Sequence, residues 1–257
     1  MTTQGEFASS VCVGILGGLV IASLHALLEH AWFYLLKTLE SKALVERLTA
    51  SIPVSTESAG YRMESFWAVA LPPMPVVAMV FLARKGFLER CHFSWDICGS
   101  FLFTWTVMVL HDAHSWLVHT LLHRSKSAYR RIHRRHHDNS GELTVFGTAY
   151  GDALEIACCI TTFYSLVTLW LYRLPQWDPL AILFLMWSMN NVDLMGHCGY
   201  RLPAWLYVPA SLGVLLTPLA QRPRHHYIRH LDPRFNRSIW DRMSATFRDQ
   251  HPKLTCY

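Results

Sequence analysis

The sequence predicts an all-α integral membrane protein with about four to five transmembrane helices and a histidine-rich cap on the cytosolic side. Of its 257 residues, 52% are hydrophobic and only 16% are charged, whereas about 25% are charged in an ordinary globular domain. The apolar residues gather in runs that are long enough to cross about 30 Å of hydrocarbon as helices. Most of the 15 histidines fall in three short clusters at the ends of these runs or in basic loops.

Five apolar runs are the predicted crossings: 11–28, 66–82, 97–122, 154–172 and 180–195. The first lacks the basic residues that precede a secretory signal and exceeds its roughly 7–15-residue apolar core, so we interpret it as a retained anchor. Three prolines between residues 72 and 75 predict a kink or break in the second run. A sixth run, 205–219, holds two prolines and a glycine, and we expect it to lie in the interface or to be re-entrant.

The basic residues predict the orientation. If the amino terminus faces away from the cytosol, residues 37–63, 124–152 and everything after residue 196 face the cytosol. These segments hold nineteen (four, six and nine) of the 23 lysines and arginines, as the positive-inside rule requires. All three histidine clusters then lie on the cytosolic side. The basic stretches are loops between crossings without a recognised binding motif, which argues against a nucleic-acid partner.

The first cluster places His119 and His123 on one predicted helix with Asp112. At about 100° per residue, the three side chains share a stripe about 40° wide. We predict both imidazoles as metal ligands near the cytosolic end, because neutral imidazole is the commonest metal ligand in proteins. Asp112 would lie deeper, as a proton-linked group or a partner that holds a ligand in place, since a carboxylate at that depth usually faces the bundle interior. Two interfacial histidines solvated by water and lipid headgroups are the alternative.

The second cluster is His133, His136 and His137. In a helix His133 faces the other two, so three imidazoles can enter one site from one turn. His197 follows the fifth apolar run. Asp193, one turn earlier, would be a carboxylate ligand or a partner that orients His197. A lone histidine in such a place is more often structural, but the combined clusters favour a ligand.

The third cluster contains His226 and His230, four residues apart, with His225 before them. Eight or more imidazoles exceed what one four- to six-coordinate ion can use, so we predict two metal ions. Imidazole does not name the metal, because iron, zinc and copper all accept it. A metal transporter would need ligands along a path at mid-membrane depth, whereas these clusters gather at one face.

The clusters resemble those of the fatty acid hydroxylase / sterol desaturase superfamily, especially its cholesterol 25-hydroxylase-like and C4-methyl sterol oxidase-like members. The resemblance covers about residues 110–247; it is specific through the first two clusters and looser at the third. Flanking residues contribute to it: Tyr129, Arg130 and Ile132 before His133, Asn139 and Ser140 after the second cluster, Gly199 and Tyr200 after His197, and Trp240 and Asp241 downstream.

The resemblance implies a membrane-bound, non-haem di-iron oxygenase of the endoplasmic reticulum. Such an enzyme uses O2 and electrons from cytochrome b5 or a similar carrier to hydroxylate or desaturate a sterol or another lipid. It implies an anchor region over residues 1–96 and a di-iron domain over residues 97–257. The iron ligands would be His119, His123, His133, His136, His137, His197, His226 and His230. Asp193 is a further candidate ligand, and Asp112 and His225 are candidate catalytic residues.

Two positions depart from the superfamily pattern. Arg229 stands where a histidine is typical, and Ala245-Thr246 replaces the usual Gly-Thr. A guanidinium group stays charged and cannot ligate metal. The site would lose one ligand to water, recruit His225 or Asp193, or be inactive. The alternative function is therefore that of a catalytically inactive relative that binds lipid or sterol and keeps the histidines as a structural metal site.

Overall fold

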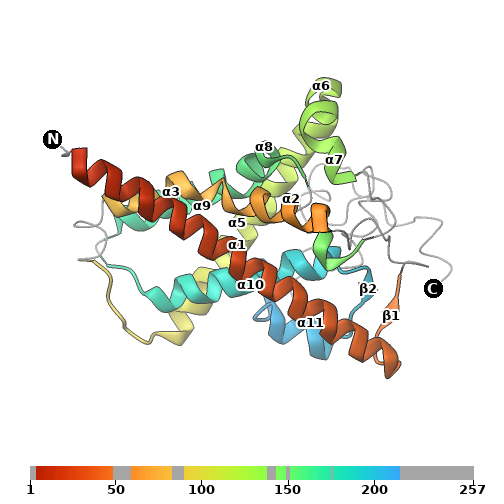
Figure 1. Cartoon of the computed structure of the whole chain (residues 1–257). Coiled ribbons are helices and arrows are strands. Elements are labelled where there is room, and N and C mark those ends of the chain that lie inside the picture. The colour runs from red at the N-terminus through yellow and green to blue at the C-terminus, as the bar shows by residue number, and fades with distance from the viewer. Residues whose placement is uncertain are drawn as a thin grey trace.

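The structure, a computed structural model, describes residues 4–48, 59–82, 90–137, 143–148, 151–174 and 176–214. It is a bundle of helices, and the only sheet in these ranges is a two-stranded one. The prediction of an all-α membrane protein is confirmed. One long helix, α1 (Gln4–Ser41), crosses the whole bundle diagonally (Figure 1). It extends the predicted first crossing at both ends.

The second predicted crossing is broken where the prolines predicted it. α2 (Ala59–Ala70) and α3 (Pro73–Leu82) are separated by a turn at residues 71–72. Pro73 is the first residue of α3, a position where its missing N–H has no helical partner to lose. The two short helices therefore form one bent segment that packs along α1 (Figure 1).

Three further helical segments complete the bundle. They are α5 (Ile97–Arg124), the continuous segment of α8 (Ala153–Ile156), the π-helix η4 (Ala157–Thr161) and α9 (Thr162–Arg173), and α10 (Pro179–His197). Aspartates cap two of them: the carboxylate of Asp96 accepts the backbone N–H of Gly99, and that of Asp178 accepts the N–H of Leu180. Both caps satisfy donors that a helix N-terminus leaves free, so α5 and α10 begin at defined residues.

The remaining elements are short. They are α6 (Lys126–Ala128), the π-helix η2 (Tyr129–His133), α7 (Arg134–His137), the 3-10 helix η3 (Val145–Gly147), α11 (Ala204–Ala210), β1 (Glu46–Arg47) and β2 (Tyr200–Arg201). α6 and α7 lie at the end of the bundle away from the amino terminus (Figure 1). α11 covers the first part of the run that we expected to be interfacial; residues 215–219 of that run lie outside the described residues.

α10 contributes to both hydrophobic cores of the bundle. Leu194 and Met195 pack in one core with α1, whereas Leu185 and Met189 pack in the other with α5 and α9. In the first core, the indole N–H of Trp32 donates to the amide oxygen of Asn191 at 2.8 Å. A buried amide needs such a partner, so this bond fixes α1 against α10. The last turns of α10, which lead to His197, therefore pack in the same core as α1.

A polar cluster joins the end of α1 to the segment after α10. Arg47 donates to both carboxylate oxygens of Glu40, at 2.8 and 2.7 Å, and Tyr200 donates to the same carboxylate at 2.8 Å. β1 and β2 pair antiparallel beside it. Burial is the main cause that raises the pKa of Tyr200, so its hydroxyl keeps its proton and remains a donor.

Three stretches within the described residues are long and apolar enough to cross a membrane: Gly5–Ser41, Arg62–Val80 and Leu154–Leu171. They correspond to the first, second and fourth predicted crossings. α5 and α10, with 28 and 19 residues, fill the third and fifth predicted crossings, which stay predictions. Many large side chains on these helices point outward, for example Leu16, Leu102 and Leu169, each more than 60% exposed. Such an apolar exterior fits a lipid environment.

Gly18 allows α1 to approach the α2–α3 turn closely. A Cβ atom at this position would lie 2.4 Å from the carbonyl oxygen of Ala70 and 2.5 Å from Cγ of Met74. We expect Gly18→Ala to destabilise the protein by about 1–3 kcal/mol, because the carbonyl cannot move without displacing a helix. Thermal unfolding of the detergent-solubilised protein measures the effect.

Gly5→Ala is the matched control for this prediction, since a Cβ at Gly5 would meet no atom within 4 Å. Alanine is favoured over glycine in a helix, so the midpoint should stay unchanged or rise slightly. Equal midpoints for Gly18→Ala and the unsubstituted protein would show that the two helices do not pack as described.

Candidate metal centre

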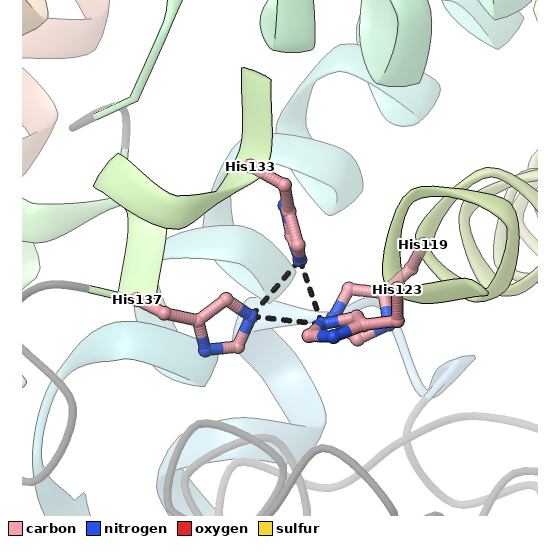
Figure 2. A group of neighbouring side chains, drawn as sticks. All are labelled: His119, His123, His133 and His137. Carbon is pink, nitrogen blue, oxygen red and sulfur yellow. Dashed lines mark hydrogen bonds between the residues drawn. The ribbon is translucent and has the colours of Figure 1, made fainter. Parts of the chain in front are cut away.

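Four histidines from two segments point toward a common centre (Figure 2). His119 and His123 come from the last turns of α5, where a spacing of four residues places both on one face. His133 ends η2 and His137 ends α7, so they too are one turn apart. His133 and His137 are buried and the other two are half-buried. One ligand nitrogen from each of the four lies within 4.8 Å of all the others.

The facing atoms are Nε2 nitrogens. Nε2 of His123 lies 3.2 Å from Nε2 of His119, 3.2 Å from that of His137 and 3.0 Å from that of His133. Nε2 of His137 and Nε2 of His133 are 2.9 Å apart. Nitrogens that each bind an ion at roughly 2.0–2.1 Å are about 2.9–3.4 Å apart for bond angles between 90° and 110°. The spacing of the four nitrogens therefore fits a shared metal ion.

Glu155 holds one of these imidazoles in place. Its Oε1 accepts a hydrogen bond from Nδ1 of His133 at 2.7 Å, and both side chains are buried. With the proton on Nδ1, the Nε2 lone pair of His133 faces the other histidines. Carboxylate partners of this kind orient metal-binding histidines and increase their basicity. Gly151 leaves space for this carboxylate: a Cβ there would lie 3.3 Å from Oε2 of Glu155.

His136 and His197 form a second pair beside the first group. Their rings lie 5.3 Å apart, edge to face. His197 is buried, and its Nδ1 donates to the backbone carbonyl of Asp193 at 2.9 Å. This bond places the proton of the neutral ring on Nδ1, so Nε2 carries the lone pair that a metal ion would need. The ring of His136 also lies 5.6 Å from that of His133 and 5.5 Å from that of His137, so His136 stands between the four-histidine group and His197, and its predicted role as a ligand stays a prediction.

Cys198, next to His197, is buried, and its Sγ accepts the backbone N–H of Tyr200 at 3.4 Å. Burial raises the pKa of this thiol to about 12, so it stays protonated at neutral pH. A thiol must lose its proton to bind metal.

The predicted acidic residues lie outside the four-histidine group. Asp112 is on α5, two to three turns before His119 and His123. Asp193 interacts with His197 through its backbone carbonyl, and its side chain lines a neighbouring cavity. His225, His226, His230 and Arg229 fall outside the described residues. Their predicted roles stay predictions.

Sequence analysis did not identify Glu155. The available signal was a carboxylate at the start of an apolar run, where burial of a charge needs a partner. His114, on α5, donates from Nε2 to the carbonyl oxygen of Cys158 at 3.0 Å. Cys158 lies in the π-helix η4, and irregular turns of this kind often accompany functional sites. The bond joins α5 to the segment that carries Glu155.

An apolar cavity of about 300 Å³ lies inside the bundle. Its wall is formed by α1, α2, α3, α9 and α10 and by the segment between α8 and α9, and most of the lining side chains are aliphatic. Its volume reaches the lower end of the range of roughly 300–1,000 Å³ that is usual for ligand pockets. Asp193 places one end of the cavity one helical turn from His197.

Comparison with known proteins gives one match. No curated protein and no solved structure matches the chain. A family model described as fatty acid hydroxylase matches residues 104–246, which is more than half of the chain. The matched range contains His119, His123, His133, His137 and Glu155, together with the third histidine cluster. The chain belongs to the fatty acid hydroxylase family, within the fatty acid hydroxylase / sterol desaturase superfamily.

Proposed function

We propose that this protein is a membrane-bound, non-haem di-iron oxygenase that hydroxylates or desaturates a sterol or another lipid. The observation that carries the proposal is the convergence of four Nε2 atoms beside an apolar cavity in a chain of this family. Imidazole also accepts zinc and copper, but membership of a lipid hydroxylase family favours iron. The proposed location is the endoplasmic reticulum, which the family resemblance suggests. The proposed orientation has the histidines facing the cytosol, because the basic residues cluster on that side.

The four-histidine group would hold one iron. His136 and His197 would hold the second together with His226 and His230 of the third cluster; Asp193 and His225 are further candidates. Iron bound there would supply the activation of O2 and the cleavage of an unactivated C–H bond. Hydroxylation consumes one C–H bond, one O2, two electrons and two protons and yields C–OH and one water. Desaturation consumes two C–H bonds with the same reagents and yields C=C and two waters.

The protein's own residues prepare this chemistry. Glu155 keeps the proton of His133 on Nδ1, and the Asp193 carbonyl does the same for His197. The aliphatic cavity would receive lipid and keep water away from the reacting carbon. Asp112 is the proposed proton-linked residue. The two electrons would come from cytochrome b5 or a reductase, and residues 97–257 are proposed as the oxygenase domain.

Iron content and lipid turnover test the proposal. The full chain, made with ample iron and purified in detergent, should contain about two irons and consume O2 when a reductant and lipid are supplied. Lipids from cells with and without the chain, compared by mass spectrometry, would show which lipid gains a hydroxyl or a double bond. Iron well below one per chain would contradict the proposal.

A catalytically inactive relative is the second candidate, and Arg229 favours it. The guanidinium replaces an expected ligand and cannot bind metal. Arg229→His separates the two functions. If the natural chain is an oxygenase, the protein with Arg229 forms product. If only the Arg229→His variant forms product, the natural chain is a lipid-binding protein with a structural metal site.

A further inference from the structure

Three polar side chains gather at one end of the apolar cavity. His25 from α1 and Asn190 and Asp193 from α10 line it there, whereas the wall farther along α10 is aliphatic and includes Ile182 and Leu185. Nδ1 of His25 donates to the amide oxygen of Asn190 at 3.0 Å. An ionisable residue in a membrane segment usually has a function, and none of the metal-binding roles uses His25.

Two buried atoms beside this group lack hydrogen bonds within the described part of the chain. Nε2 of His25 faces Oε1 of Glu29 at 3.5 Å, and neither atom has a hydrogen-bond partner there. Their side chains are 10% and 7% exposed. A gap of 3.5 Å is too long for a direct bond, but a hydroxyl that lies beside both atoms can donate its one hydrogen to either of them and accept from the other where that atom carries a proton.

The charges at this end select against an anionic lipid. Asp193 lines this end, Glu29 approaches His25 from the adjacent cleft, and the described residues that line the cavity include no lysine or arginine. Arg62 lines an adjacent cleft with Glu29, and its guanidinium lies over the ring of Phe146. A carboxylate or phosphate in the cavity would face like charge without a cation. A neutral hydroxyl can bond to these groups.

The polar end lies on the side of the metal centre. Asp193 precedes His197 by four residues, which is about 6 Å along a helix. From Asn190 the aliphatic wall extends back to Ile182, about 12 Å in the opposite direction. A lipid with its hydroxyl at His25 would therefore extend its apolar body away from the metal centre.

We propose that His25, Asn190 and Glu29 bind the hydroxyl group of a neutral lipid alcohol. The carbons nearest the hydroxyl would then lie closest to the four-histidine centre. The proposed binding site does not depend on the oxygenase function. The predicted position of oxidation does rest on that function, in which O2 and the electron carrier are the co-reactants.

Binding to the iron-free full chain in nanodiscs tests the site. Tritiated hexadecan-1-ol is the probe, with unlabelled hexadecane, hexadecanoic acid, cholesterol and cholestane as competitors. Hexadecan-1-ol should bind about tenfold more tightly than hexadecane, and cholesterol about tenfold more tightly than cholestane, because each alcohol adds one or two hydrogen bonds. The alcohol that binds more tightly shows whether the site prefers a straight-chain alcohol or a sterol.

Substitutions then locate the preference. Asn190→Leu and His25→Leu should each lower the affinity for the alcohol about tenfold and leave that for the hydrocarbon unchanged. Met186→Leu is the control, because Met186 lines the same cavity and the change conserves volume. Thermal unfolding verifies that every variant is folded.

Three results would overturn the site: no binding of either alcohol to folded protein, equal competition by alcohol and hydrocarbon or by acid and alcohol, or a preference that survives both leucine substitutions. Because iron is absent from these assays, they succeed or fail independently of the oxygenase. With iron loaded, product carrying its new group far from the hydroxyl would refute only the predicted position of oxidation.

Discussion

His123→Ala should remove about one iron per chain and lower product formation at least about 100-fold, because the loss of a ligand opens one metal site. Nε2 of His123 lies within 3.2 Å of the Nε2 atoms of the other three histidines. Iron quantification by mass spectrometry and lipid product analysis measure the two effects.

His92→Ala is the matched control for this experiment, since His92 is exposed and lies outside the four-histidine group. It should keep both iron and activity. Full iron content in folded His123→Ala would show that the four histidines do not share an ion. If a variant loses iron because it no longer folds, its thermal unfolding midpoint will also fall. The midpoint is therefore measured for both variants.

Glu155→Leu should weaken iron binding at the four-histidine group about 10- to 100-fold, the range found when the partner of a metal-binding histidine is lost. Leucine fills the buried space but cannot accept the hydrogen bond from Nδ1 of His133, whose nitrogen lies 2.7 Å from Oε1 of Glu155 in the natural protein. The imidazole would then be free to rotate or to change tautomer. Chelator competition on the purified protein gives the iron affinity.

Glu155→Gln provides the partial rescue that a merely space-filling role would not show. The glutamine oxygen can still accept from Nδ1, so its iron affinity should fall between those of the leucine variant and the natural protein. Equal affinity for Glu155→Leu and the natural protein would contradict the orienting role. Equal loss in both variants would indicate that the charge of Glu155, and not the acceptor, is required.

Helical periodicity made the four-histidine group largely predictable. His119 and His123, and His133 and His137, are each four residues apart, and this spacing places two rings on one face whatever the surroundings. The break at Pro73 followed from the chemistry of proline in the same way. These features depend on local geometry alone.

Features that depend on packing could not be read from the sequence. His136 and His137 are neighbours whose side chains diverge by about 100° on a helix, and the position of α10 brings the ring of His197 to 5.3 Å from that of His136. Glu155 reaches His133 across 22 residues of chain, and His25 reaches Asn190 across 165. No short-range pattern relates such pairs.

X-ray absorption at the iron K-edge of the purified full chain tests the central claim most directly, because it reports the atoms bound to iron. We expect about two irons per chain, with nitrogen neighbours at roughly 2.0–2.2 Å and the outer-shell scattering of several imidazole rings. In His123→Ala the imidazole contribution should fall with the iron content. Iron without imidazole scattering, or a spectrum unchanged in His123→Ala, would contradict the shared histidine site.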